Sequence, residues 1–338
     1  MKKFKKILSV ALSGAILIGF SQITAVSESE NQCVYLGGQP FGVKFYNNGV
    51  VVINLESYYD GSKYICPAKE GGLKVNDIIK KVDGEAICTN EALQEAAENS
   101  NGKTVTLTIE REGKEETKSI TPKRNTVGMY LIGAWVRDSC AGIGTITYYD
   151  ADKNYFAALG HGICDNDTSL LLPLGTGEAV HANINGISKS SCGKAGSLNG
   201  YFTDSTIGYL IKNTEIGVYG TISDNFSNNK RKIEIADNHD IKAGSAKLYT
   251  TIEGEEPKYY SIKIKRIVSL NPESNENFVI KITDEKLMDY CGGIVQGMSG
   301  SPIIQDGKLI GAVTHVFLNN PSEGYGVTAQ NMVTKYSE

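Results

Sequence analysis

The second half of the chain is built from short apolar runs separated by Gly, Asn and Asp, and this pattern constrains the fold most. After residue 125 these runs include "GTITYYD", "STIGYLI", "YYSIKIKRIVSL" and "KLIGAVTHVFL". The first stretch in this half that reads as an amphipathic helix is "DEKLMDYCG", at residues 284–292. Many short strands at modest spacing are typical of barrels and sandwiches, so we expect a mainly β fold.

A glycine-rich loop around two serines lies directly before two of these runs. The loop "GMSGSP" contains Ser299 and Ser301. Glycines let successive backbone N–H groups turn toward one point, where they can stabilise the oxyanion of acyl transfer. We therefore predict Ser299 as a nucleophile, Ser301 as structural support, and an oxyanion hole from the loop amides around Gly297 and Met298, including that of Ser299. The motif resembles the nucleophile loop of chymotrypsin-like proteases.

A serine nucleophile requires a base, and the chain has four histidines. His161 follows the apolar run "YFAAL" and lies between two glycines, a context that presents its ring from a rigid element. His181 and His239 lie in polar stretches. His315 lies within the apolar run "GAVTHVF", where we expect a structural role. The sequence thus favours His161 as the general base.

Two aspartates are candidates for the acid that orients the base. Asp284 in "KITD" precedes Ser299 by 15 residues, and Asp204 in "YFTD" follows His161 by 43. The order expected of a chymotrypsin-like double barrel favours Asp204. Asp165 and Asp167 are close to His161 in the sequence, but capping of a local turn explains them better.

The first half has a different pattern. "EGGLKVNDIIKKVDGEAI" reads as turn, strand, hairpin and strand, with the hairpin turn at Asp83-Gly84. "TNEALQEAAENSNG" reads as a helix capped by Thr89 or Asn90, and two alternating strands follow it. This order resembles a small α+β PDZ domain, which we place at residues 34–124.

The PDZ resemblance implies a groove in which a partner peptide adds a strand and loop amides hold its end. The stretch "LGGQPFGVKF" at residues 36–45 fits the glycine-containing loop and the strand edge beside it. The residues that we predict to bind peptide ends or loops are Leu36, Gly37, Gly38, Phe41 and Gly42.

The N-terminus has the pattern of an export signal. Four lysines precede an uncharged run of 14 residues at 7–20, shorter than the roughly 20 residues of a membrane span. We expect residues 1–27 to be a signal peptide or a signal anchor, which leaves the protein outside the cytoplasm, secreted or membrane-anchored.

Composition excludes several other classes of protein. The net charge is −4 with no basic block beyond the N-terminus, which argues against nucleic acid as a partner. Seven cysteines are present without a C-x-x-C pair, so we expect no metal site and no cofactor, and most cysteines as small buried side chains.

From about residue 127 to the end, the chain resembles the SpoIVB peptidase family of sporulation serine proteases. The matching stretches are "VRDSCAGIGTITYYD", "AALGH" followed by "DNDT", "KITD", "GGIVQGMSGSPIIQDGKLIGAVTHVF" and "GYGV". The resemblance implies a chymotrypsin-like double β-barrel peptidase domain at residues 125–338. It also implies His161, Ser299 and Asp284 as the catalytic residues, so the choice between Asp284 and Asp204 stays open.

The same resemblance implies a function. Members act between the two membranes around the forespore, cleave themselves, and then cleave a membrane-bound regulator of an intramembrane protease. This leads to activation of a late mother-cell sigma factor. The partners expected are therefore this protein substrate and the chain itself, with the PDZ domain recognising them.

Two alternatives remain at this point. One is a non-catalytic, PDZ-led binding or scaffolding protein with a decayed protease fold, which the intact contexts of His161 and Ser299 argue against. The other is a cysteine peptidase using Cys291 or Cys164, neither of which lies in a glycine-built oxyanion loop.

Overall fold

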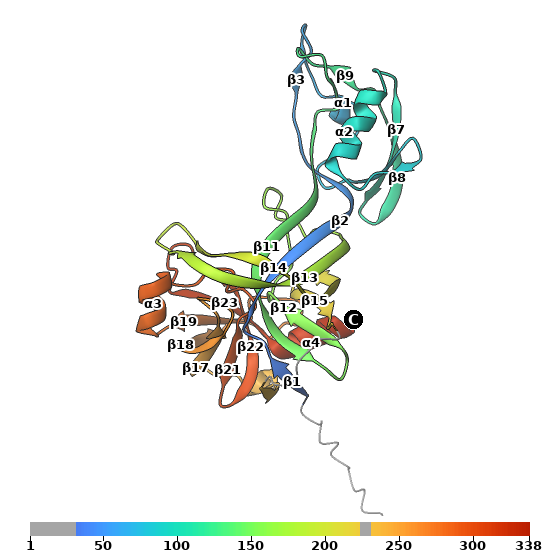
Figure 1. Cartoon of the computed structure of the whole chain (residues 1–338). Coiled ribbons are helices and arrows are strands. Elements are labelled where there is room, and N and C mark those ends of the chain that lie inside the picture. Colours follow the sequence, from blue (N-terminus) through green and yellow to red (C-terminus); the bar gives the residue numbers. More distant parts are fainter. Residues whose placement is uncertain (1–31, 224–230) are drawn as a thin grey trace, which may run out of the picture. The chain divides into compact units, whose positions relative to one another are not determined.

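The computed structural model describes residues 32–223 and 231–338 (Figure 1). The predicted leader at residues 1–27 lies outside the described residues. Within the described part, no helix is long and apolar enough to cross a lipid bilayer. The fold is mainly β, as predicted, and contains two barrels and a smaller α+β module.

The first barrel consists of six antiparallel strands whose pairings return to the starting strand. In order of pairing, the strands are β2 (Pro40–Leu55), β11 (Ala134–Asp150), β12 (Tyr155–Ala158), β15 (Gly217–Thr221), β14 (Gly196–Thr214) and β13 (Leu174–Ser188). Phe41 and Phe156, among its core residues, are fully buried and meet edge to face. Two short strands extend the sheet beyond β11: β1 (Cys33–Leu36) and β16 (Lys232–Glu234).

The second barrel is also closed and six-stranded. Its strands, in order, are β17 (Gly244–Thr250), β18 (Lys258–Ile267), β19 (Phe278–Ile282), β23 (Glu323–Thr328), β22 (Lys308–Val316) and β21 (Pro302–Gln305). The 3-10 helix η1 (Asn238–Asp240) precedes it, and the helices α3 (Glu285–Cys291) and α4 (Ala329–Ser337) follow β19 and β23. Isoleucines, Leu248 and Phe278 fill its core.

The α+β module occupies residues 48–133, and we call it the PDZ-like module. Its elements are β3 (Tyr58–Tyr59), β4 (Tyr64–Ile65), α1 (Pro67–Glu70), β5 (Ile78–Val82), β6 (Glu85–Ala86), α2 (Asn90–Asn99), β7 (Val105–Arg111), β8 (Lys114–Ile120), β9 (Lys123–Arg124) and β10 (Tyr130–Leu131). Thr89 caps α2 by accepting a hydrogen bond from the Ala92 amide at 3.1 Å. Asp83 and Gly84 both have positive φ and form the hairpin turn that the sequence predicted.

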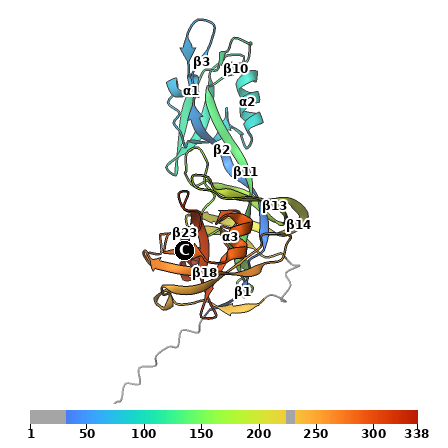
Figure 2. The same cartoon turned by 90° about the vertical axis from the view of Figure 1, so that its left-hand side faces the viewer.

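One long strand belongs to both the first barrel and the PDZ-like module. The first part of β2 pairs with β13 between residues 41 and 47, whereas Val50 and Val51 pair with β5. β11 runs beside β2 throughout, from residue 40 to residue 55 (Figure 2). Residues 34–46 therefore complete the barrel sheet, although the sequence analysis assigned them to the PDZ domain.

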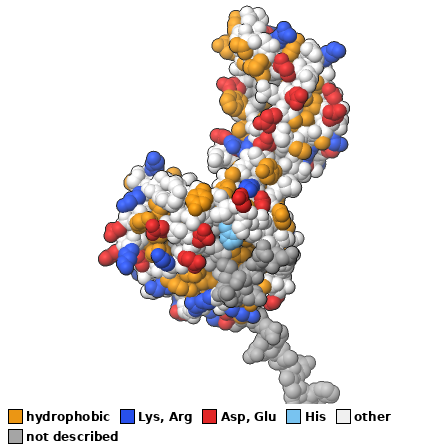
Figure 3. Space-filling model, in the orientation of Figure 1, with side chains coloured by type: hydrophobic (Ala, Val, Ile, Leu, Met, Phe, Trp, Pro, Cys, Tyr) orange, Lys and Arg blue, Asp and Glu red, His pale blue; other side chains and the backbone are white. Residues whose placement is uncertain are grey.

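The surface carries both signs of charge. On the face shown in Figure 3, lysine and arginine side chains are interspersed with aspartate and glutamate, and hydrophobic side chains lie between them.

Candidate active site

His161 is presented by a strained turn at the end of β12. Leu159 and Gly160 both have positive φ, +67° and +69°, a conformation that a β-carbon disfavours. A Cβ at Gly160 would also lie 3.1 Å from the Val313 carbonyl oxygen. The turn therefore lies close against β22 of the second barrel and brings the half-buried His161 to that strand.

A backbone carbonyl fixes the tautomer of His161. Its Nδ1 lies 2.8 Å from the Gly162 carbonyl oxygen. A carbonyl can only accept a hydrogen bond, so Nδ1 carries the proton and Nε2 retains its lone pair. This is the tautomer that a general base requires.

Ser299 lies in a loop whose backbone requires a glycine at position 300. The loop joins β20 (Val295–Gln296) to β21, and Gly300 adopts φ +91°. A Cβ at Gly300 would lie 2.0 Å from the Thr145 carbonyl oxygen, so no larger residue fits. In this conformation the Ser299 Oγ donates to the Thr314 carbonyl oxygen at 2.8 Å.

Two buried threonines of β11 tether the Ser299 loop to the first barrel. Thr145 Oγ1 donates to the Gly297 carbonyl at 2.7 Å, and the Thr145 amide donates to the Ser299 carbonyl at 3.0 Å. Thr147 Oγ1 donates to the Gly300 carbonyl at 2.8 Å. Sequence reasoning missed both threonines because the run "GTITYYD" gives no signal beyond strand alternation. Ser301 is buried and donates to Thr250 Oγ1 at 2.8 Å, consistent with its predicted supporting role.

His161 and Ser299 come from different barrels and line one cleft of about 650 Å³. The described residues that line this cleft include no Asp, Glu, Lys or Arg. Apolar side chains form much of its wall: Val43, Ile143, Leu159, Ile163, Leu198, Ile294, Val295, Val316 and Leu318. The structure thus brings together the two residues that the sequence singled out.

His315 also lines the cleft, which corrects the purely structural role that we expected for it. Its ring centroid lies 4.9 Å from that of His161, and the two planes are tilted by 30°. The pairing of β22 with β23 is irregular between Val313 and Val316. This bulge directs the Thr314 carbonyl to Ser299 and the His315 ring to His161, and a bulge leaves no clear mark in a sequence.

Desolvation favours the neutral form of both imidazoles, although the His315 side chain is exposed to solvent at the cleft. Desolvation, together with the neighbouring His315, lowers the pKa of His161 to about 4, although the Gly162 carbonyl opposes this shift. Desolvation also lowers the pKa of His315. The candidate base is therefore unprotonated at neutral pH.

The predicted oxyanion hole is only partly in place. The Met298 amide donates to the Val295 carbonyl at 3.1 Å, so Met298 has no free donor in this conformation. Within the described residues, the Ser299 amide donates no hydrogen bond, so this donor is available to an oxyanion. Gly297 lies between them with φ +98°.

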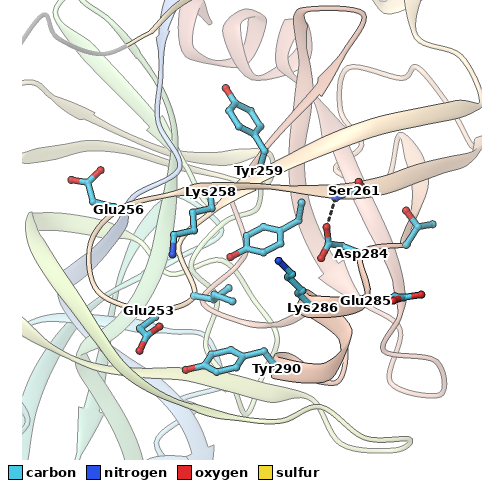
Figure 4. A pocket seen from close by; sticks show the side chains of 12 residues that line it. Glu253, Glu256, Lys258, Tyr259, Ser261, Asp284, Glu285, Lys286 and Tyr290 are labelled. Atoms are coloured by element: carbon cyan, nitrogen blue, oxygen red, sulfur yellow. Dashed lines mark hydrogen bonds between the residues drawn. The ribbon is translucent and has the colours of Figure 1, made fainter.

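Neither candidate acid lies at His161. Asp284 caps α3, where Oδ1 accepts from the Leu287 amide at 3.2 Å and Oδ2 accepts from the Ser261 amide at 3.1 Å. It lines a separate pocket of about 680 Å³, where its bond to Ser261 is visible (Figure 4). Asp204 is exposed on β14 and does not line the cleft. The acid role predicted for Asp284 is therefore corrected to a helix cap.

Asp165 caps the turn after His161, as predicted, whereas the Asp167 side chain forms an ion pair instead of a cap. Asp165 Oδ1 accepts from the amides of Asp167 and Thr168, both at 2.9 Å. Arg137 of β11 forms ion pairs with both carboxylates. These contacts fix the turn to the first barrel, and neither carboxylate lines the cleft.

The residues that we predicted to bind peptide lie in the first barrel instead. The amides of Leu36, Gly37 and Gly38 already donate to the carbonyls of Arg231, Thr147 and Ile146. Phe41 is fully buried in the barrel core, and Gly42 pairs with both β11 and β13. The prediction is corrected because the strand edge it requires is paired on both sides.

The PDZ-like module has a groove elsewhere. Helix α2 and residues 130–136 enclose about 560 Å³, lined by the apolar side chains Leu93, Ala97, Ile132, Ala134 and Val136 and by Trp135. Asn90 Oδ1, at the start of α2, lines this groove and is buried without a hydrogen-bond partner among the described residues.

The cysteines do not provide an alternative nucleophile. All seven are free thiols, and only Cys66 and Cys291 are buried, fewer than expected. Desolvation raises the pKa of Cys291 to about 12 and raises the pKa of Cys164 as well. Neither forms a thiolate readily, as a cysteine nucleophile must.

Comparison with known proteins matches both halves of the chain. The model of the SpoIVB peptidase S55 family matches residues 128–333, more than half of the chain, and a PDZ domain model matches residues 14–121. A solved PDZ domain of an SdrC-like protein from Listeria monocytogenes is 24% identical, covering 26% of this chain and 87% of its own, with a TM-score of 0.22. The inactive form of the Rv3671c protease is 11% identical, covering 58% of this chain and 83% of its own, with a TM-score of 0.33. Among curated proteins no match was found.

Proposed function

Because the chain belongs to the SpoIVB peptidase S55 family, and is thus a sporulation serine peptidase with a PDZ domain, we propose a specific role for it. It is an exported endopeptidase that cleaves itself and then a membrane-bound regulator of an intramembrane protease. That cleavage leads to activation of a late mother-cell sigma factor. The site of action is the space between the mother-cell and forespore membranes, and the lysine-flanked apolar run at residues 7–20 supports export.

The observation that carries the proposal is the placement of Ser299 and His161 in one cleft, with His161 in the tautomer of a base. The Ser299 hydroxyl turns from the Thr314 carbonyl to His161 Nε2, which takes its proton as Oγ attacks the scissile carbonyl. His161 then gives this proton to the departing amine. Water then attacks the acyl-enzyme, with His161 again acting as the base, and the acyl group is released as a carboxylic acid.

The loop amides hold the oxyanion of this reaction. The Ser299 amide is one donor, and Gly297 and Met298 supply others once Met298 releases the Val295 carbonyl. Loss of one such donor costs roughly 10²–10³ in kcat.

The cleft favours a substrate with uncharged side chains at the scissile bond. The residues before Ser299 and those after His315 contribute Ile294, Val295, Val316 and Leu318 to its wall. A charged side chain buried there would lose its hydration without gaining a partner, at a cost of several kcal/mol.

The groove beside α2 binds a peptide segment of the partner or of the chain itself. Its apolar wall suits aliphatic side chains, and the unpartnered Asn90 Oδ1 requires a donor from the ligand. Trp135 is the sole tryptophan and lines the groove, so its fluorescence reports occupancy directly. Titration with peptides from the substrate should shift this emission, whereas Trp135→Phe should abolish the signal.

A fluorophosphonate probe tests the nucleophile. Wild-type protein should be labelled, Ser299→Ala should not, and Ser301→Ala should still be labelled because Ser301 only supports the loop. Autoprocessing should follow the same pattern. If Ser299→Ala were still labelled, or if Ser301→Ala were the variant that lost labelling, the nucleophile would be Ser301.

A further inference from the structure

Two hairpins of the PDZ-like module are joined at one end of it. β3 and β4 form the first hairpin, and β9 and β10 form the second. The Tyr58 hydroxyl lies 2.8 Å from the carbonyl oxygens of both Lys123 and Leu131, so it connects the two hairpins directly. Figures 1 and 2 place both hairpins at the same end of the module. We call residues 59–64 and 123–130 the paired hairpin tips.

The paired hairpin tips expose large apolar side chains. Tyr59 and Tyr64 pair across the first hairpin with ring centroids 5.5 Å apart, and they are 44% and 75% exposed. Val127 and Met129 of the second hairpin are 73% and 42% exposed. A single exposed apolar residue is common on a protein surface, but four on two joined hairpins are a candidate interaction site.

Hydrogen bonds within both turns hold these side chains outward. Asn125 Oδ1 accepts from the amides of Val127 and Met129, both at 3.0 Å, and the Asn125 amide donates to the Met129 carbonyl at 2.9 Å. In the first hairpin, Asp60 Oδ1 accepts from the Lys63 amide at 2.8 Å. The turns are therefore ordered before any partner arrives, which lowers the entropic cost of docking.

The charge at the paired hairpin tips is mainly positive. Three of their exposed side chains are basic: Lys63, Lys123 and Arg124. Residues 123–130 contain no Asp or Glu, and Asp60 is the single acid of residues 59–64. Glu98 of α2 also reaches this end, where its Oε2 accepts from the Tyr130 amide at 2.7 Å. Figure 3 shows hydrophobic and basic side chains close together at this end of the module.

We propose that the paired hairpin tips dock on an anionic lipid surface. Tyrosine rings suit the boundary between headgroups and acyl chains because they combine an apolar body with a polar end. Val127 and Met129 enter the apolar side of that boundary, and the basic side chains bind the lipid phosphates. This inference does not depend on the catalytic role of Ser299.

The size of the patch favours a lipid surface over a protein partner. At exposed fractions of 42–75%, the four apolar side chains present on the order of 400 Å². A standard protein interface needs about 800 Å² from each partner. A few inserted side chains with basic neighbours are enough for reversible attachment to an anionic membrane, where each lysine strengthens binding roughly fivefold.

Quenching by brominated lipids tests the proposal on the full chain. Trp135→Phe removes the native tryptophan, and Val127→Trp then places a single fluorophore in the tips. In vesicles of phosphatidylcholine and phosphatidylglycerol with brominated acyl chains, we expect its emission to be blue-shifted and quenched. Adding Lys63→Glu and Lys123→Glu should lower the ratio of docked to undocked tips by at least about 10-fold.

The controls separate the tips from the rest of the chain. Residues 1–27 are common to all variants, so differences in quenching report the tips. Lys114→Glu, at an exposed lysine of β8, should leave the quenching unchanged, and thermal unfolding checks that each variant folds. Unquenched emission in the anionic vesicles would overturn the proposal, as would equal quenching in phosphatidylcholine alone. Light scattering that grows with protein concentration, together with unquenched emission, would assign the tips to a second copy of the chain instead.

Discussion

The threonine tethers of the Ser299 loop allow a quantitative test of how the nucleophile is held. Thr145→Val removes the hydroxyl that donates to the Gly297 carbonyl but preserves the shape of the side chain. Thr145 is 1% exposed, so the carbonyl is left in a buried site without that donor. An unpaired buried acceptor costs about 1–3 kcal/mol, a sizeable part of a typical total stability of about 5–15 kcal/mol. Thr147→Val should have a similar cost through the Gly300 carbonyl.

The assay is urea unfolding of both single variants and the double variant. Since both threonines hold one loop, the two losses should not add. The looser loop should also slow fluorophosphonate labelling of Ser299 by about 10- to 10²-fold, as expected for a misplaced nucleophile. Thr104→Val removes the hydroxyl of an exposed threonine that is hydrogen-bonded to Thr121. This variant serves as the control and should change stability by less than about 0.5 kcal/mol. Valine variants at 145 and 147 that match this control in stability and labelling would refute the reasoning.

Three further predictions follow from the site. Asp284→Ala should lower the free energy of unfolding, measured in urea, by about 0.5–2 kcal/mol because the α3 cap is lost. Asp284→Asn should lower it by less. A large loss of kcat in a stably folded Asn variant would instead identify Asp284 as the triad acid. Activity requires neutral His161, whose pKa is about 4. We therefore expect kcat/KM to stay constant through mildly acidic pH and to fall only as the pH drops through about 4. A fall in kcat/KM centred near pH 6.5 would contradict the desolvated environment of His161. Leu318→Asp, at an exposed position of the cleft wall, should shift peptide preference toward Lys and Arg, whereas Leu318→Asn should not; equal preferences in both variants would show that this wall does not contact the substrate.

The sequence predicted the two main site residues because glycine marks both of their turns. Gly300 leaves no room for a β-carbon, and Gly160 has a positive φ that a β-carbon disfavours, so the residue type itself records the geometry. The mainly β fold, the α2 cap and the Asp83-Gly84 hairpin were equally readable, since each depends on local patterning. These features are short-range, and short-range physics is visible in a single sequence.

The errors concern contacts between segments distant in the sequence. Asp284 follows a strand at a plausible distance from Ser299, but its two backbone partners belong to α3 and β18. His315 reads as a core residue because only a bulge turns its ring toward His161. Residues 36–42 carry a PDZ-like pattern, yet their partners in β11 and β13 lie about 100 or more residues away. Spacing along the chain does not reveal which sheet edge a strand will join.

The path of β2 makes the PDZ-like module an insertion within the peptidase fold rather than a domain placed before it. The chain contributes β1 and the start of β2 to the barrel sheet, leaves for residues 48–133, and returns along β11 beside the strand it left. Removing the chain up to residue 124 would therefore delete two strands of the barrel sheet along with most of the module. A variant without the module is better made by excision, joining β2 to β11 through a short hairpin turn.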